Sequence, residues 1–147
     1  MTSQTIQTGT ASVTRTASVP RTALLLAAAI AVAGLANTLI AFVAIAAGAS
    51  TAFAPLTPPA LLTFTAVGVL IGYAGWRLVR RLFTRPARVL RVLVPVALVL
   101  SWVPDVILAI VQFIPGTTLT GVIGLALMHA VVVAVAVPVY LRIAPVS

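Results

Sequence analysis

Charged side chains are scarce and thiols are absent in this 147-residue chain. The lack of cysteine excludes disulfides, thiolate metal sites and thiol nucleophiles. Charged residues make up 7% of the chain, whereas soluble domains carry about 25%, so the chain could not cover a water-facing surface. Hydrophobic residues make up 62%. This composition predicts a protein whose main solvent is lipid.

Acidic chemistry is nearly absent as well. Asp105 is the single acid, lysine does not occur, and nine arginines give a net charge of +8. The chain has no Walker loop, no G-x-S-x-G, no H-E-x-x-H and no pair of carboxylates. One carboxylate cannot bind the metal ions that phosphate-ester chemistry needs. We therefore expect no metal and no cofactor. We also expect no nucleic-acid partner, because membrane topology explains the arginines better.

Four apolar segments are long enough to cross a bilayer, which takes about 20 residues. Residues 1–21 are rich in Ser and Thr, which predicts a disordered cytoplasmic tail. A cleaved signal peptide is the alternative for the first apolar segment, but its 25 residues exceed the usual apolar core of about 7–15. The prediction is an all-α, integral membrane four-helix bundle over residues 22–145, with spans at about 24–48, 61–79, 92–114 and 119–141.

The arginines predict the orientation of the spans. Every arginine lies in the N-terminal tail, in the connection between the second and third spans, or after the fourth span. The positive-inside rule places these segments in the cytoplasm, so both termini are predicted inside a bacterial cytoplasmic membrane. The central connection could also contact anionic lipid headgroups, although setting topology is its usual role. It carries Arg77, Arg80, Arg81, Arg85, Arg88 and Arg91.

Three polar side chains fall at a similar depth in three different spans. Asn37 and Asp105 lie 11 and 9 residues before the outer ends of their spans, and His129 lies 10 residues after the outer end of its own. At 1.5 Å per residue each lies roughly 14–17 Å deep, near the midplane of a core about 30 Å thick. Asp105 is the only acid and His129 the only imidazole, so we expect them to pair.

The residues around Asp105 extend this candidate site. Ser101 and Trp102 lie four and three residues before Asp105, on the same helix face. Pro104 removes a backbone donor and clashes with the carbonyl of the residue four positions earlier. This predicts a kink that widens the space beside Asp105. The predicted intramembrane polar site consists of Asn37, Ser101, Trp102, Asp105 and His129.

Several roles remain open for this site. A structural clasp between helices is one, although such contacts contribute only about 0.6 kcal/mol on average, against an insertion cost of a few kcal/mol. A proton-linked or small-ligand site is another, and it is the leading hypothesis for a non-enzymatic protein that could also associate with a membrane complex. Haem or metal ligation by His129 has a poor ligand set. A small intramembrane enzyme would use His129 as general base, oriented by Asp105.

Two further patterns concern helix packing. Gly68 and Gly72 form a small-residue pair that allows close helix approach, and a homo-oligomeric scaffold packed through this pair is a third functional hypothesis. Tyr73, Trp76 and Tyr140 lie near span ends, as interfacial aromatic residues do.

Three short motifs carry a resemblance to a known family. They are Gly72-Tyr-Ala-Gly-Trp76 before the arginines, Leu100-Ser-Trp-Val-Pro-Asp105 in the third span, and Leu127-Met-His129 followed by an apolar run in the fourth. On these motifs the chain resembles a family of small actinobacterial four-helix membrane proteins, described as a domain of unknown function. The resemblance covers about residues 22–145. It implies the four-span topology and marks Asp105 and His129 as family-like positions, and it implies no activity or substrate.

Overall fold

The computed structural model describes residues 18–146, and within them the chain is helical. The all-α prediction is confirmed for this part of the chain. Most of the predicted tail, residues 1–17, lies outside the described residues, and residues 19–21 form the start of the first helix. The elements are α1 (Val19–Ala46), the 3-10 turn η1 (Ala54–Leu56), α2 (Pro58–Leu82), α3 (Pro86–Ser101), α4 (Val103–Val111) and α5 (Leu119–Ile143).

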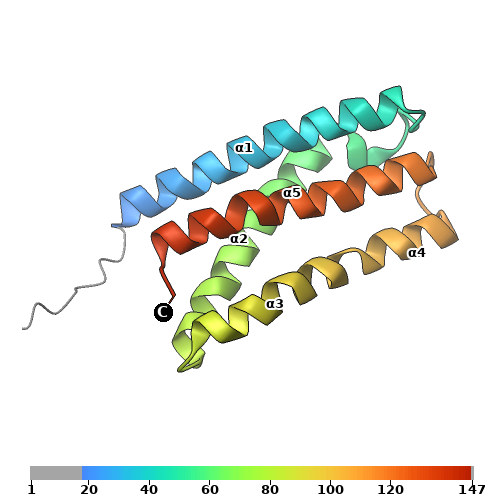
Figure 1. The fold of residues 1–147 in the computed structure, drawn as a ribbon. Coiled ribbons are helices and arrows are strands. Elements are labelled where there is room, and N and C mark those ends of the chain that lie inside the picture. Colours follow the sequence, from blue (N-terminus) through green and yellow to red (C-terminus); the bar gives the residue numbers. More distant parts are fainter. Residues whose placement is uncertain (1–17, 147) are drawn as a thin grey trace, which may run out of the picture.

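Four helical stretches are long and apolar enough to cross a membrane, with α3 and α4 counted together as one stretch. They pack as a bundle in which α1 and α5 run side by side in opposite directions, while α2 and α3 meet at a hairpin and diverge from it (Figure 1). Large apolar side chains cover the outside, among them Leu35, Phe64 and Ile110, which are each more than two-thirds exposed. Such a surface suits lipid rather than water, and the four stretches together suggest a multi-pass membrane protein.

The contact between α1 and α5 is made by small residues. Ala33, Asn37, Ala41 and Ala44 of α1 are all buried, as expected for residues that recur on one helix face. A Cβ added to Gly124 of α5 would lie 3.2 Å from the Cβ of Ala44. This close approach sets the distance between the two helices, and it buries the polar side chain of Asn37 in the bundle.

The prediction that Trp76 and Tyr140 are interfacial aromatics is wrong for this bundle. Both side chains are buried. The indole Nε1 of Trp76 donates a hydrogen bond to the backbone carbonyl of Ala144 at 3.0 Å, and the Tyr140 hydroxyl donates to the carbonyl of Val69. Aromatic side chains with one polar atom can be buried when that atom finds a partner. Here the partners lie in the chain itself, so Trp76 and Tyr140 tie α2 to the C-terminal end of the bundle.

The third span is interrupted at Trp102, between α3 and α4. Pro104 lies at the second position of α4, where its missing N–H and its ring prevent a continuous helix. The predicted kink therefore takes the form of a break. As a result Asp105 lies in the first turn of the new helix α4. A negative charge is favourable there because of the helix dipole, by about 0.3–1 kcal/mol.

All the arginines of the described residues lie at one end of the bundle, called here the arginine end. This end contains the start of α1, the α2–α3 hairpin and the end of α5 (Figure 1). The two connections at the opposite end, residues 47–57 and 112–118, carry no charged residue. The arginines concerned are Arg21, Arg77, Arg80, Arg81, Arg85, Arg88, Arg91 and Arg142.

The residue after α4, Gln112, has a left-handed backbone with φ of 52°. This conformation costs a non-glycine residue about 1–2 kcal/mol and is favoured by glycine after a helix. Gln112→Gly is therefore expected to raise the free energy of unfolding by about 1 kcal/mol. Thermal melting in detergent, followed by circular dichroism, measures the change. Val111→Gly, one residue earlier and inside the helix, should instead lower the free energy of unfolding by about 1 kcal/mol. Equal decreases in the two variants would contradict this interpretation.

Candidate functional site

A cavity of about 570 Å³ is lined by residues of η1 and of all five α-helices. Most of its lining is apolar, but polar side chains from α1, α2, α3, α4 and α5 reach it. We call it the polar cavity. The structure thus brings four of the five predicted site residues to one space. The polar lining residues are Asn37, Thr65, Ser101, Asp105 and His129.

Asp105 and His129 form the charged part of the polar cavity. The Nδ1 atom of His129 lies 3.2 Å from Oδ2 of Asp105 and 2.9 Å from the carbonyl oxygen of Leu125, one turn earlier in α5. Because a carbonyl oxygen only accepts, Nδ1 must carry the hydrogen, which leaves Nε2 as the acceptor of a neutral ring. The carboxylate side chain is 9% exposed and the imidazole 40% exposed. The imidazole is therefore the more accessible member of the pair.

The Nδ1–H hydrogen bond goes to the Leu125 carbonyl, so Oδ2 of Asp105 stays without one. That oxygen is buried and has no hydrogen-bond partner among the described residues, despite its short distance to Nδ1. The contact between Asp105 and His129 is thus an electrostatic one with poor hydrogen-bond geometry. A buried acceptor without a donor costs about 1–3 kcal/mol, more if it is charged.

Asn37 has a partner that the sequence did not reveal. Its Nδ2 donates to the hydroxyl of Thr65 in α2 at 2.9 Å, and both residues are buried. The amide oxygen of Asn37 has no hydrogen-bond partner among residues 18–146. Thr65 gives a weak signal in a sequence, because a threonine in a helix commonly bonds to the backbone of its own preceding turn. Two residues that line the polar cavity, Asn37 and Asp105, therefore each have a buried acceptor oxygen without a donor among residues 18–146.

Ser101 and Trp102 differ from the prediction. The Ser101 hydroxyl lines the cavity but donates to the carbonyl of Leu98 at 2.6 Å. Trp102 is not among the lining residues, and its indole Nε1 donates to the carbonyl of Ala126 in α5 at 3.0 Å. The break at Trp102 is the reason, because residues before and after it no longer follow one helical face. Trp102 therefore anchors the break to α5 and does not contribute to the site.

Metal binding would have few ligands here. Asp105 and His129 are adjacent, but no group of three or more metal-ligating side chains occurs in the described part of the chain. Zinc sites in proteins use three or four such ligands. The donor set of the polar cavity consists of one carboxylate, one imidazole, one amide and two hydroxyls, which suits hydrogen bonding to an organic or protic ligand better.

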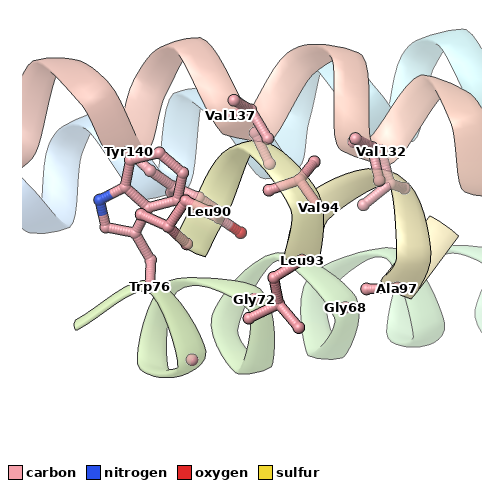
Figure 2. A pocket seen from close by; sticks show the side chains of 13 residues that line it. Gly68, Gly72, Trp76, Leu90, Leu93, Val94, Ala97, Val132, Val137 and Tyr140 are labelled. Atoms are coloured by element: carbon pink, nitrogen blue, oxygen red, sulfur yellow. The ribbon is translucent and has the colours of Figure 1, made fainter. Parts of the chain in front are cut away.

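A second, apolar hollow continues from the polar cavity toward the arginine end. It has a volume of about 210 Å³ and lies between α2, α3 and α5 (Figure 2). We call it the glycine groove, because Gly68, Gly72 and Gly75 of α2 line it. The groove and the polar cavity share four lining residues, so the two spaces adjoin. The shared residues are Gly68, Ala97, Val132 and Val133.

The glycine pair predicted for helix packing faces α5 of the same chain. A Cβ added to Gly72 would lie 2.7 Å from the Tyr140 hydroxyl, and one added to Gly68 would lie 3.8 Å from Val132. This contact within the chain uses part of the face that a homo-oligomeric scaffold would need, although both glycines remain exposed. The oligomeric state itself remains a prediction.

Fold and site together describe a small all-α protein with four candidate membrane spans around a polar cavity. The chain belongs to a family of unknown function, DUF6069, whose model matches residues 15–145. The predicted membership of a family without a known function is thus confirmed. No curated protein and no solved structure matches the chain.

Proposed function

We propose that this protein is a non-enzymatic, multi-pass membrane protein whose polar cavity binds a small ligand that donates hydrogen bonds. In the proposed arrangement both termini and the arginine end face the cytoplasm of a bacterium, as the positive-inside rule favours. One observation carries the proposal. Asn37 and Asp105 each have a buried acceptor oxygen without a donor in the described part of the chain, and both residues line the same cavity.

A clasp that served only stability would be expected to satisfy its polar atoms. More than 90% of buried polar groups in proteins have a hydrogen-bond partner, and a partly satisfied network is less stable than an apolar one of the same shape. Two unpaired acceptors on residues that line one cavity instead favour a donor that comes from outside the described chain. Ammonium and hydroxyl groups are such donors, including those of a side chain from a partner protein in a membrane complex, and a proton could instead bind to the Asp105 carboxylate.

Thermal shifts with small probes test this function. Butylamine, butanol and butyrate would be added separately to the protein in detergent, at one pH and equal concentration. Because a ligand that binds only the folded state raises the melting temperature, we expect stabilisation by butylamine and butanol but not by butyrate. The Asn37→Leu/Asp105→Leu variant should lose the effect, whereas Ser101→Ala should keep it. Stabilisation by butyrate, or equal shifts in the double variant, would refute the proposal.

An intramembrane enzyme is the second candidate, favoured by one observation. Nδ1 of His129 faces Asp105 and the Leu125 carbonyl, so Nε2 is left as the basic atom of an accessible imidazole. General base catalysis uses such an arrangement, in which a base, here His129, is oriented by a neighbouring group, here Asp105. Mass spectrometry of small molecules that co-purify with wild type and His129→Gln separates the candidates. An enzyme would accumulate a different, unreacted species in the variant, whereas a binding protein would retain the same species in both.

A further inference from the structure

The glycine groove presents almost entirely hydrocarbon surface. Its two polar neighbours, the Trp76 indole and the Tyr140 hydroxyl, already donate to backbone carbonyls inside the bundle. Figure 2 shows Trp76 and Tyr140 at one end of the groove, with Ala97 and Val132 at the other. An occupant of this space therefore finds no hydrogen-bonding group, and an alkyl chain is the chemistry that fits it.

The groove opens sideways, between α2 and α3. Gly68, Gly72, Gly75 and Ala97 line it and are exposed, and the two helices diverge from their hairpin (Figure 1). Along α2, Trp76 lies eleven residues after Thr65 of the polar cavity, which is roughly 16 Å at a rise of 1.5 Å per residue. This is about half of a hydrocarbon core of about 30 Å. The groove and cavity together thus match the reach of one acyl chain within a single leaflet.

Positive charge flanks the end of the groove near the hairpin. Arg80 lies one turn beyond the lining residue Trp76, and Arg91 lies three residues before the lining residue Val94, so each is a surface neighbour of the groove. Arg77 is engaged elsewhere, since it donates to the Tyr73 hydroxyl at 3.1 Å. No acidic side chain can neutralise these arginines, because the single acid Asp105 is beside His129 in the polar cavity.

We infer that the glycine groove binds one anionic phospholipid, with its phosphate at Arg80 and Arg91 and one acyl chain between α2, α3 and α5. An arginine cluster without acidic partners attracts anionic headgroups. The adjoining apolar groove would hold one acyl chain of the bound lipid, whereas both chains of a surrounding lipid stay in the bilayer. The acyl chain and the anionic headgroup therefore both contribute to binding. This inference does not rest on the ligand proposed for the polar cavity, because none of its residues is Asn37, Asp105 or His129.

Gly75 offers a way to fill the groove without disturbing the bundle. A Cβ added there meets no atom within 4 Å. Gly75→Leu should therefore not lower the melting temperature of the lipid-free protein, while its side chain occupies the groove. Ala74→Leu, the adjacent position in α2 that lines neither space, is its matched control. Ala97→Leu fills the same groove from α3, and serves as the second variant if Gly75→Leu does not fold.

Native mass spectrometry of the full chain in mild detergent, titrated with phosphatidylglycerol or phosphatidylcholine, tests the inference. Wild type should retain one phosphatidylglycerol in preference to phosphatidylcholine. Gly75→Leu should bind it at least about tenfold more weakly, and Ala74→Leu should match wild type. Arg80→Gln/Arg91→Gln should lose roughly 10- to 30-fold of the preference for the anionic lipid. Arg21→Gln/Arg142→Gln, which removes the same charge from α1 and α5, should keep it.

Three results would overturn the inference: equal retention of the two lipids by wild type, unchanged binding in both groove-filling variants, or equal effects of the two arginine pairs. The first would indicate a groove for any hydrocarbon chain. The second would place the lipid elsewhere on the surface, and the third would indicate attraction by net charge alone.

Discussion

His129→Leu is expected to lower the free energy of unfolding by about 1–3 kcal/mol, the usual cost of leaving a buried polar group without a partner. The Asp105 carboxylate is almost fully buried, its Oδ2 lies 3.2 Å from Nδ1 of His129, and that oxygen has no hydrogen bond among the described residues. Without the imidazole, the carboxyl group would be left in a mostly apolar cavity with no compensating group. Reversible unfolding in mixed micelles, followed by circular dichroism, measures the loss.

The Asp105→Leu/His129→Leu double variant is the matched control for this prediction. It removes both partners, so no buried charge is left unpaired, and replacement of a buried pair by apolar side chains is often neutral or stabilising. We therefore expect the double variant to be at least as stable as wild type. A double variant as unstable as His129→Leu would show that the pair is a structural clasp, and it would remove the main support for a ligand site.

Gly72→Ala is expected to destabilise the bundle by about 1–3 kcal/mol, as overpacking of a tight contact does. The new Cβ would lie 2.7 Å from the Tyr140 hydroxyl, which is buried and bonded to the carbonyl of Val69. Tyr140 must then move and give up this hydrogen bond, or α2 and α5 must separate. Gly75→Ala meets nothing within 4 Å, so it should gain up to about 1 kcal/mol of helix propensity. Thermal melting of the two variants in one detergent compares them.

A double-mutant cycle with Tyr140→Phe tests the cause. Removing the hydroxyl makes room for the Cβ at position 72, so Gly72→Ala should cost less in the Tyr140→Phe background than in wild type. Additive effects of the two changes would show that the Tyr140 hydroxyl does not set the cost. Such a result would also weaken the description of α2 and α5 as held together by Gly72 and Tyr140.

The second prediction concerns how α2 meets the rest of the bundle. Near the arginine end it packs closely through Gly72 and Tyr140, and farther along it borders the polar cavity with Thr65. The close contact holds the helix in place, while its divergence from α3 leaves the space that the proposed ligand and lipid would use. Stability and binding are thus expected to depend on different residues of one helix.

The sequence by itself was sufficient for the features that depend on length, composition and single special residues. Long apolar runs predicted four helices because a helix is the way to satisfy every backbone hydrogen bond in lipid. Pro104 predicted a kink in the third span, because proline removes a backbone donor and its ring clashes with the preceding turn, although Pro95 and Pro138 lie inside helices that continue. The similar depth of Asn37, Asp105 and His129 followed from helical rise alone, and the structure places all three on one cavity.

The tertiary structure decided which side chains meet, because the rotation and tilt of each helix come from packing against its neighbours. Thr65 is the hydrogen-bond partner of Asn37, and Trp102 donates to the carbonyl of Ala126. The hydroxyl of Tyr140 lies close to Gly72. The lack of a donor for the buried oxygens of Asn37 and Asp105, among the described residues, is also a feature that only the tertiary structure decided. Whether a buried acceptor finds a donor depends on contacts between helices distant in sequence, which a one-dimensional pattern of apolar and polar residues does not encode.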